Sequence, residues 1–324
     1  EVGFSVSSAG DINGDGLDDL IIGAQGKNDA TGSTYVVFGK EVYNSLIQIS
    51  DIADGNGGFV INGESAWERS GYSVSSAGDI NGDGVDDLII GAYGADPNGD
   101  HSGRTYVVFG QKQLNSPIQL SEIAASKGGF VIDGEAEYDL SGISVSSAGD
   151  VNGDDLADLV IGAPYADPNG KMEAGSSYVV FGRKGNYSSI KLSDVASGAG
   201  GFVIHGKSAS DYSGHSVSSA GDVNGDGFDD LIIGAYGADP NEIRDAGRSY
   251  IVFGKKGNNV AVQLSDIAAG TGGFVINGQS AYDYSGRSVS SAGDFNGDGF
   301  ADLIIGAYGS DANGDKTGST YVIL

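Results

Sequence analysis

The chain of 324 residues contains 44 acidic and 17 basic residues, which gives a formal net charge of −27. So acidic a composition argues against nucleic acids and acidic membranes as partners. The strongly apolar runs are far shorter than the roughly 20 residues of a membrane-spanning helix, so no membrane insertion is expected. Cysteine is absent, which excludes disulfide bonds.

One motif recurs five times along the chain. It first reads SVSSAGDINGDGLDDLIIGA at residues 5–24, and it returns at 73–92, 144–163, 216–235 and 288–307. In the first repeat, strands are predicted at 4–10, 19–24, 33–39 and 58–63. Strands 2 to 4 carry runs such as LII, YVVF and FVI, which predict a sheet covered on both faces. The connections are too short for crossover helices, so the strands should run antiparallel.

Antiparallel four-stranded sheets that cover one another are the blades of a β-propeller. A stacked solenoid is the alternative, but its usual repeats are shorter. We therefore predict an all-β fold, with one β-propeller domain over 1–324. Its repeats are expected at about 1–70, 71–141, 142–213, 214–285 and 286–324.

The fifth repeat lacks a fourth strand, because the sequence ends at Leu324 within the third. Five blades are thus visible, the last without its outer strand, and they could be part of a larger propeller. We expect a GFVING-like strand immediately upstream, with further repeats of the same polypeptide completing the ring.

The connections between strands 3 and 4 (40–57, 111–128, 183–200 and 255–272) contain IQLSEIA-like segments. Each predicts one short helical turn that packs under its blade. The predicted N-caps are Ser50, Ser121, Ser193 and Ser265.

Each repeat also carries an acidic nine-residue loop between strands 1 and 2. Positions 1, 3, 5 and 9 of the first loop are Asp11, Asn13, Asp15 and Asp19, and Leu17 can offer its carbonyl from position 7. Calcium takes six to eight oxygen ligands of these kinds. The residue at position 12 is isoleucine and lies in a strand, so the loop is not an EF-hand. Asx-rich turns without metal are the alternative.

About five Ca²⁺ ions, one per repeat, are therefore predicted. The ligands in the other four loops are Asp79, Asn81, Asp83, Val85 and Asp87; Asp150, Asn152, Asp154, Leu156 and Asp158; Asp222, Asn224, Asp226, Phe228 and Asp230; and Asp294, Asn296, Asp298, Phe300 and Asp302. The third loop has Asp155 at position 6, where the others have glycine, so a left-handed backbone and a weaker site are expected there.

The opposite face carries the loops that join strand 4 to strand 1 and strand 2 to strand 3. Aromatic and charged residues on variable loops of a repetitive scaffold are typical of a binding face. The candidate ligand-binding residues are Trp67, Arg69, Tyr138, Tyr212, Tyr282 and Tyr284. Capping of blade ends is the alternative role, and it is favoured for the repeated Tyr93, Tyr165, Tyr236 and Tyr308.

These motifs resemble the FG-GAP repeat of integrin α-subunit propellers and of bacterial calcium-binding proteins. The resemblance covers the whole chain, although only Gly162, Ala163 and Pro164 keep a literal GAP. It implies calcium at the loop residues named above. It also implies ligand recognition on the face away from the metal, and a bacterial chain that is extracellular, either secreted or at the cell surface.

The favoured function is that of a calcium-stabilised adhesion propeller that recognises a protein or glycan ligand. The alternatives are a non-catalytic propeller appended to a secreted hydrolase or lyase, and a structural spacer in a large surface protein. No enzymatic activity is expected of the chain itself. Its only histidines, His101, His205 and His215, are not repeated and form no catalytic spacing.

Overall fold

The computed structural model describes residues 2–41, 46–112, 117–185, 187–257, 260–311 and 317–324. Parts of the four predicted connections between strands 3 and 4, and of the loop that follows Tyr308, lie outside these residues. The described chain forms two compact units, one of residues 1–147 and 182–192 and one of residues 148–181 and 193–324.

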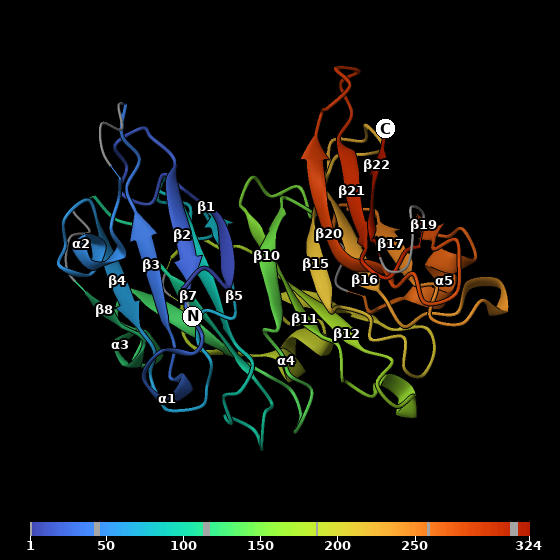
Figure 1. The fold of residues 1–324 in the computed structure, drawn as a ribbon, viewed down its shortest axis with the longest axis horizontal. Helices are drawn as coiled ribbons and strands as arrows, with labels where there is room; N and C mark the ends of the chain where they lie inside the picture. Colours follow the sequence, from blue (N-terminus) through green and yellow to red (C-terminus); the bar gives the residue numbers. More distant parts are fainter. Residues whose placement is uncertain (1, 42–45, 113–116, 186, 258–259, 312–316) are drawn as a thin grey trace. The chain divides into compact units, whose positions relative to one another are not determined.

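The fold is all-β, as predicted, and each repeat forms its own antiparallel sheet (Figure 1). Strand 1 of the five repeats is β1 (Ser5–Gly10), β5 (Ser73–Gly78), β10 (Ser144–Gly149), β15 (Ser216–Gly221) and β20 (Ser285–Gly293). Strand 2 is β2 (Asp19–Gly23), β6 (Asp87–Ala92), β11 (Asp158–Ala163), β16 (Asp230–Ala235) and β21 (Asp302–Ala307). Strand 3 is β3 (Ser33–Val37), β7 (Arg104–Val108), β12 (Ser176–Val180), β17 (Arg248–Val252) and β22 (Ser319–Ile323). Strand 4 is β4 (Gly58–Asn62), β9 (Gly129–Asp133), β14 (Gly201–His205) and β19 (Gly273–Asn277).

Three sheets gain a short fifth strand that the sequence did not predict. The strands β8 (Ile118–Gln119), β13 (Ile190–Lys191) and β18 (Val262–Gln263) pair in parallel with β4, β9 and β14. Each of them lies in the connection between strands 3 and 4 of the repeat that follows. A repeat therefore reaches back and covers the outer edge of the preceding sheet. The sheet of the fifth repeat has three strands, β20 to β22.

Each connection between strands 3 and 4 contains a single helical turn, and in the last three it directly follows the short strand. The turns are α2 (Ile49–Ala53), α3 (Leu120–Ala124), α4 (Leu192–Ala196) and α5 (Leu264–Ala268). The predicted serine N-caps are wrong, since Ser50, Ser121, Ser193 and Ser265 are the second residues of these helices. In α2, α3 and α5 the residue before the helix is an extended glutamine without a side-chain cap. In α3 and α5 it belongs to the short parallel strand, so the helix begins directly after that pairing.

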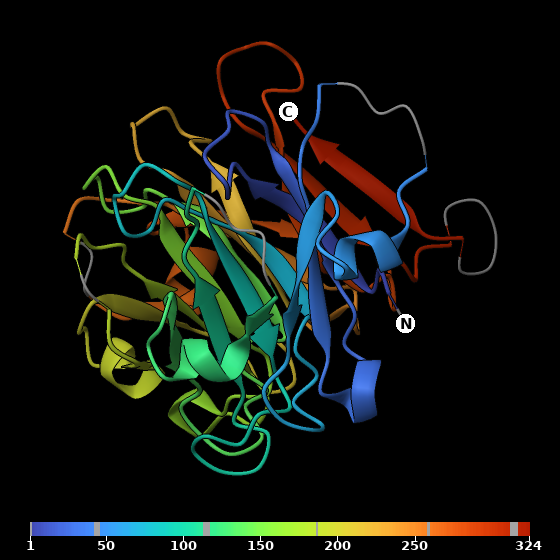
Figure 2. The same ribbon diagram turned by 90° about the vertical axis from the view of Figure 1, so that its left-hand side faces the viewer.

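The predicted packing of these turns is confirmed. Leu120 and Ile123 are buried in the core of the first unit, and Leu264 and Ile267 are buried in that of the second. Helices α2 and α3 lie against strands 3 and 4 of their own sheets (Figure 2). No helix within the described ranges combines the length and the apolar character needed to cross a membrane.

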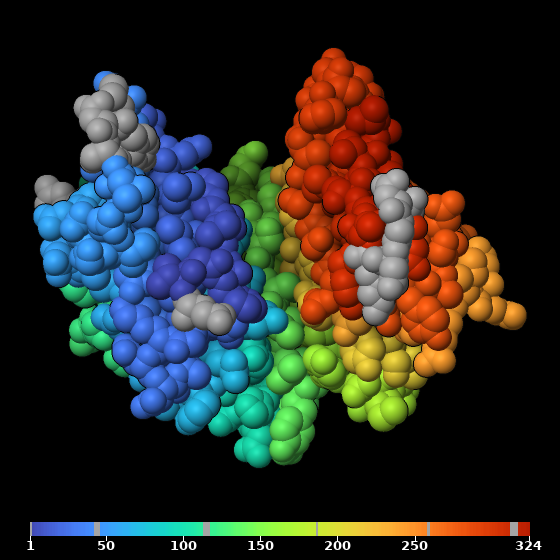
Figure 3. Space-filling view, in the orientation of Figure 1, coloured from blue at the N-terminus to red at the C-terminus, as the bar shows by residue number. Residues whose placement is uncertain are grey.

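Apolar side chains from successive sheets form shared cores. In the first unit, Ile21 and Val36 of the first sheet pack with Leu88 and Tyr106 of the second. Burying each such side chain contributes about 1.5–3 kcal/mol. Both faces of β6, β11 and β16 are thus buried, as their uninterrupted apolar runs predict. Leu20 of the first sheet and Val322 of the fifth are 52% and 44% exposed, however, so the predicted cover on both faces is wrong for these two sheets. In Figure 3 the fifth repeat, coloured red, forms a ridge on the second unit, and Phe295 of its acidic loop is 73% exposed.

The loops between strands 2 and 3, called 2–3 loops below, are 24–32, 93–103, 164–175, 236–247 and 308–318. They contain the irregular turns α1 (Lys27–Ala30), η1 (Pro168–Gly170) and η2 (Pro240–Glu242). In the first sheet, α1 and the acidic loop after β1 lie at opposite ends of the strands (Figure 1). The acidic loops and the 2–3 loops therefore belong to different ends of a sheet.

Candidate functional site

The backbone of every acidic loop is wound around the carboxylate at position 1. In the first loop, the Asp11 carboxylate accepts the amides of Asp15 at 3.0 Å and Gly16 at 2.8 Å. The carboxylate of Asp15 then accepts the amide of Leu17 at 3.0 Å. The other four loops repeat these bonds with closely similar distances. The loops are thus tightly curled, and their carboxylate oxygens face the loop interior.

The aspartate at position 9 begins strand 2 and is buried in every repeat. Asp87 is fully buried and accepts the amides of Ile80 at 3.2 Å and Gly110 at 2.9 Å. Burial raises the pKa of Asp87 to about 8, with further rises from the charges of Asp83 and Asp79, while the amide bonds oppose the shift. Burial likewise raises the pKa of Asp19 to about 6 and that of Asp230 to about 7.

The first loop contains an acceptor with no partner. Asp19 is 1% exposed, and its Oδ1 accepts the Gly39 amide at 2.8 Å. Its Oδ2 is buried without a hydrogen-bond partner. An unpaired buried carboxylate oxygen is costly. A divalent cation would relieve that cost, so the loop fits a metal ion.

The donor set is therefore suited to calcium, with carboxylates, an asparagine amide and the position-7 carbonyl in one curled loop. Within the described ranges, no three acidic or histidine side chains already converge as a preformed metal cluster. Carboxylates 4 Å apart repel by about 4 kcal/mol at an effective dielectric of 20. Their closer approach would depend on the ion.

The acidic loops are also fastened to the following repeat. The amide of Gln111 donates to the Ile12 carbonyl, and that of Lys255 donates to the Val151 carbonyl. The side chain of Asp86 accepts the Asp11 amide at 2.9 Å. Asp229 accepts the Asp150 amide in the same way at 2.8 Å. The first and third loops are thus held by the following repeat as well as by their own hydrogen bonds.

The third loop has the backbone that its sequence predicts. Asp155 has a φ of 66°, and its side chain is exposed. Glycine adopts this left-handed conformation without the cost of about 1–2 kcal/mol that other residues bear. We expect Asp155→Gly to tighten one calcium site by several-fold in a calorimetric titration. An unchanged or weaker site would show that the Asp155 carboxylate assists binding.

The loops joining strand 4 to strand 1 (63–72, 134–143, 206–215 and 278–284), called 4–1 loops below, share one backbone conformation. Two alternate residues in each have positive φ: Trp67 and Arg69, Tyr138 and Leu140, Ser210 and Tyr212, and Tyr282 and Tyr284. Their amides donate to carbonyls of the preceding 2–3 loop, as from Trp67 to Asp29 and from Arg69 to Ala30. These bonds hold the strained conformation in place.

All six predicted ligand-binding residues thus lie at positive-φ positions. Trp67, Arg69 and Tyr138 belong to the first unit, and Tyr212, Tyr282 and Tyr284 belong to the second. Trp67, Tyr138 and Tyr282 are exposed, by 64%, 55% and 46%. Arg69, Tyr212 and Tyr284 are partly buried. Of the two positive-φ residues in the loops of Trp67, Tyr138 and Tyr282, the first is therefore the more exposed and the second is partly buried, as at Arg69.

Comparison with protein families identifies five matching regions, which together cover more than half of the chain. The family is the FG-GAP repeat, and the matched residues are 2–37, 70–108, 141–180, 213–252 and 285–323. The chain belongs to the FG-GAP repeat family. Its five sheets correspond to FG-GAP propeller blades.

Relatives of this FG-GAP chain include Integrin alpha-5 of Xenopus laevis, which is 31% identical over 242 residues. That alignment covers 73% of the chain and 20% of the relative. Integrin alpha-2 of Mus musculus is 27% identical over 317 residues, covering 95% of the chain and 22% of the relative. Phosphatidylinositol-glycan-specific phospholipase D of Bos taurus is 33% identical over 189 residues, covering 55% of the chain and 21% of the relative. The chain thus spans about a fifth of these proteins.

The partly buried rings of the second unit stack between successive FG-GAP repeats. Tyr212 lies parallel to Tyr236, with ring centroids 5.2 Å apart, and Tyr284 lies parallel to Tyr308 at the same separation. Tyr165 contacts Tyr212 edge-on at 5.4 Å. In the first unit, Arg69 lies over the Tyr93 ring at 5.8 Å. The inward residues therefore join the 4–1 and 2–3 loops.

Sequence reasoning missed a buried acidic residue in each 4–1 loop. These residues are Glu68, Asp139, Asp211 and Asp283, all at most 9% exposed. Each accepts the backbone amide three residues before it, as Asp211 does from Ser208 at 3.0 Å. Each of them lies two residues before a serine, as in ESAWERS and its counterparts, so this repeated spacing could have identified them from the sequence.

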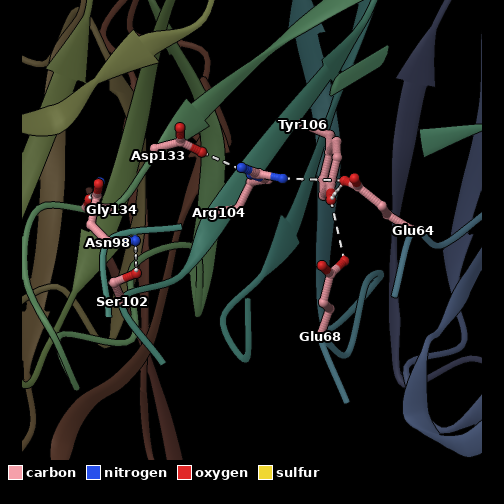
Figure 4. A network of polar contacts seen from close by, with 8 residues as sticks. All are labelled: Glu64, Glu68, Asn98, Ser102, Arg104, Tyr106, Asp133 and Gly134. Atoms are coloured by element: carbon pink, nitrogen blue, oxygen red, sulfur yellow. Dashed lines mark hydrogen bonds and ion pairs between the residues drawn. The ribbon is translucent and has the colours of Figure 1, made fainter. Parts of the chain in front are cut away.

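A second missed feature is the polar network of the second repeat (Figure 4). Arg104 Nε donates to Asp133 Oδ1 at 2.7 Å, and its Nη1 donates to Glu64 Oε2 at 3.2 Å. The Tyr106 hydroxyl lies 2.7 Å from Glu64 Oε2 and 3.2 Å from Glu68 Oε2. Burial and the Glu64 charge raise the pKa of Glu68. The guanidinium is thus paired with two carboxylates.

Proposed function

We propose that this FG-GAP chain is a calcium-stabilised binding propeller that acts outside the cell, secreted or at the cell surface. Its ligand is a protein or a glycan, recognised by the 4–1 loops at the end of the sheets away from the acidic loops. Five calcium ions, one per acidic loop, would stabilise the other end of each sheet, where the acidic loops lie. The bacterial origin that the resemblance implied stays a prediction.

The calcium part of the proposal is supported by the residues of the loops. They supply the oxygen types that calcium prefers, in five copies with the same spacing. The unpartnered Oδ2 of Asp19 adds a buried acceptor that a cation would satisfy. The chain's own contribution is to bind and orient the ion, since the position-1 and position-5 carboxylates are already aligned by loop amides.

One observation carries the binding part: the strained backbone beneath the candidate ligand residues. A non-glycine residue at positive φ costs about 1 kcal/mol or more. The chain uses glycine freely where only conformation matters. After α3, for example, Ser126 has a φ of 59°, and the equivalent residues of other repeats are Gly55, Gly198 and Gly270. No repeat places glycine at the positions of Trp67 or Arg69.

Large exposed rings at strained positions are thus retained against a conformational cost. Exposed aromatic residues are enriched in the centres of protein interfaces, and they also stack on sugar rings. The relatives include integrin α chains, which are adhesion-type proteins by family, and this agrees with a binding role. The loops vary between repeats in side chain but not in backbone, which suits recognition on a constant frame.

The experiment removes the rings and relieves the strain together. We expect Trp67→Gly, Tyr138→Gly and Tyr282→Gly, combined in one chain, to abolish binding to the hits of a glycan and secreted-protein array. The free energy of unfolding should stay within about 1 kcal/mol of the wild type, because the substitutions relieve backbone strain. Ser126→Gly is the matched control, since it relieves strain away from the 4–1 loops and should leave binding unchanged.

Two outcomes would contradict the binding role. The wild-type chain could bind nothing on the array, or the triple variant could bind as well as the wild type. The phospholipase D relative favours a second candidate, a non-catalytic propeller beside a hydrolytic domain. In that case the array would be empty, while the isolated chain would bind the hydrolase domain of its parent protein.

A further inference from the structure

The second and fourth repeats each place an arginine at the start of strand 3, but only one of them is neutralised. Arg104 begins β7 and pairs in register with Asp133, while Arg248 begins β17 and pairs in register with Asn277. The 4–1 loop residue that reaches Arg104 is Glu64, and its counterpart before the fourth repeat is Lys207. Both carboxylate partners have therefore been replaced, one by an amide and one by a cation.

The arginine without carboxylate partners is also the more buried one. Arg248 is 8% exposed, whereas Arg104 is only partly buried. Arg248 Nε donates to Asn277 Oδ1 at 2.7 Å, and its Nη1 lies 3.3 Å from the Tyr250 hydroxyl. Among the described residues it forms no direct ion pair; burial raises the pKa of Asp211 to about 6, and the charge of Arg248 opposes that rise from a distance. A buried guanidinium that no carboxylate contacts directly is costly, so an anion from outside would be held there.

A cavity of about 520 Å³ lies beside this group, within the range of small-ligand pockets. It is lined by the 4–1 loop before the fourth repeat and by the 2–3 loop of that repeat, and both Arg248 and Lys207 face it. Arg244 lies at its rim with 74% of its side chain exposed and is 3.4 Å from Asp245. Three cations thus gather at one cavity of a chain that has a net charge of −27.

The same cavity also offers many acceptors. Asp211, Asp239 and Asp245 line it together with Ser208, and the ring of Tyr212 forms part of its wall. Asp211 is buried and accepts the Ser208 amide, but it makes no ion pair with Arg248 or Lys207 in the described part of the chain. The lining therefore suits a ligand with one acid group and several hydroxyl donors.

We propose that this cavity binds an acidic sugar, with Arg248 and Lys207 holding its carboxylate. The hydroxyl groups of the sugar would donate to Asp211, Asp239 and Asp245, and its ring face would lie along Tyr212. An acidic peptide matches the cavity less well, because its repeated carboxylates would meet the three lining carboxylates. This inference deepens the proposed binding function by naming a ligand class, and it rests on that function for the role of the 4–1 loops.

The test rebuilds the second-repeat network in the fourth repeat. We expect the wild-type chain to bind galacturonate, which has one carboxylate, but not neutral galactose, in a calorimetric titration. Lys207→Glu with Asn277→Asp supplies the two carboxylates that Arg104 has, so affinity for galacturonate should fall at least tenfold. The melting temperature of this variant should be equal to or above that of the wild type, because the buried guanidinium is then paired. Lys255→Glu, which makes the same lysine-to-glutamate change outside the cavity, should keep wild-type affinity.

Three results would overturn the inference. They are no binding of galacturonate by the wild type, equal binding by the double variant, or equal loss in Lys255→Glu. Binding of tetraglutamate in place of the sugar would show that the ligand is an acidic peptide. The Trp67, Tyr138 and Tyr282 variant separates this inference from the proposed function. If the inference alone fails, array binding still depends on those rings; if the function alone fails, the sugar still binds at the cavity.

Discussion

Chelation of calcium is expected to lower the melting temperature of the chain by about 10 °C, and added calcium should restore it. Extracellular calcium modules have dissociation constants of about 10⁻⁴–10⁻³ M. At tenfold excess each loop would add about 1.4 kcal/mol, and five would add about 7 kcal/mol. The first unit contains two of the loops and the second contains three. A gain of about 3–4 kcal/mol in a unit of this size corresponds to a shift of that order.

Differential scanning calorimetry in excess chelator, in calcium and in magnesium measures this effect. Magnesium should restore little stability, because it demands a compact octahedral site and keeps its water ligands. Asp15→Asn is a matched variant that removes one charge from the first loop and keeps an acceptor for the Leu17 amide. It should lose part of the calcium-dependent shift without lowering the melt in chelator. A wild-type melt that is unchanged by chelator would contradict calcium stabilisation.

Asp87→Asn is expected to be more stable than the wild type without calcium and less stable than the wild type with calcium bound. Without calcium, Asp87 is a fully buried carboxyl with its pKa raised to about 8 by burial. The asparagine side chain carries no charge, although its NH₂ group would face one of the two backbone N–H groups that donate to the Asp87 carboxylate. We expect the calcium-free variant to be more stable than the wild type by about 2 kcal/mol near neutral pH. In calcium the variant should be the less stable of the two, because it lacks a ligand charge.

The pH dependence gives the sign of this effect. The folded pKa of Asp87 lies above its ordinary value of 3.8. The stability associated with its protonated form is therefore fully present below about pH 4 and is lost as the pH rises through 8. Calcium-free wild type should lose stability over that interval relative to Asp87→Asn. Asp83→Asn is the control: it removes a charge from the same loop and should weaken calcium binding, but in chelator it should raise stability less than Asp87→Asn does, because Asp83 is exposed. Equal stability of Asp87→Asn and wild type in chelator would contradict the argument.

The sheets and the acidic loops could be predicted because the same residue pattern occurs in all five repeats. Runs such as LII and YVVF mark strands that are buried on both faces, and the structure has strands there with boundaries within a residue or two. The position-9 aspartates could be assigned to the start of strand 2 from spacing alone. Asp155 could be assigned a left-handed backbone because glycine stands there in every other repeat, and this is confirmed.

The features that were missed depend on pairings between residues far apart in the sequence. Nothing local in Ile118 and Gln119 indicates that they pair with Ile61 and Asn62 of the preceding repeat. In α3, α4 and α5 the helix begins directly after the paired residues, one position before the serine that was predicted as N-cap. The difference between Arg104 and Arg248 likewise becomes visible only when strand register shows which residues face each arginine.

The short strands β8, β13 and β18 also determine when a sheet can be completed during synthesis. A growing chain emerges from its N-terminus, and β4 appears well before Ile118 and Gln119. Until then the outer edge of the first sheet is open, and an open strand edge can pair with a neighbouring copy. Each of the first three repeats thus passes through an interval in which its outer edge waits for a strand of the next repeat. The pace of translation or secretion across that interval would set how often two nascent chains join instead of folding alone.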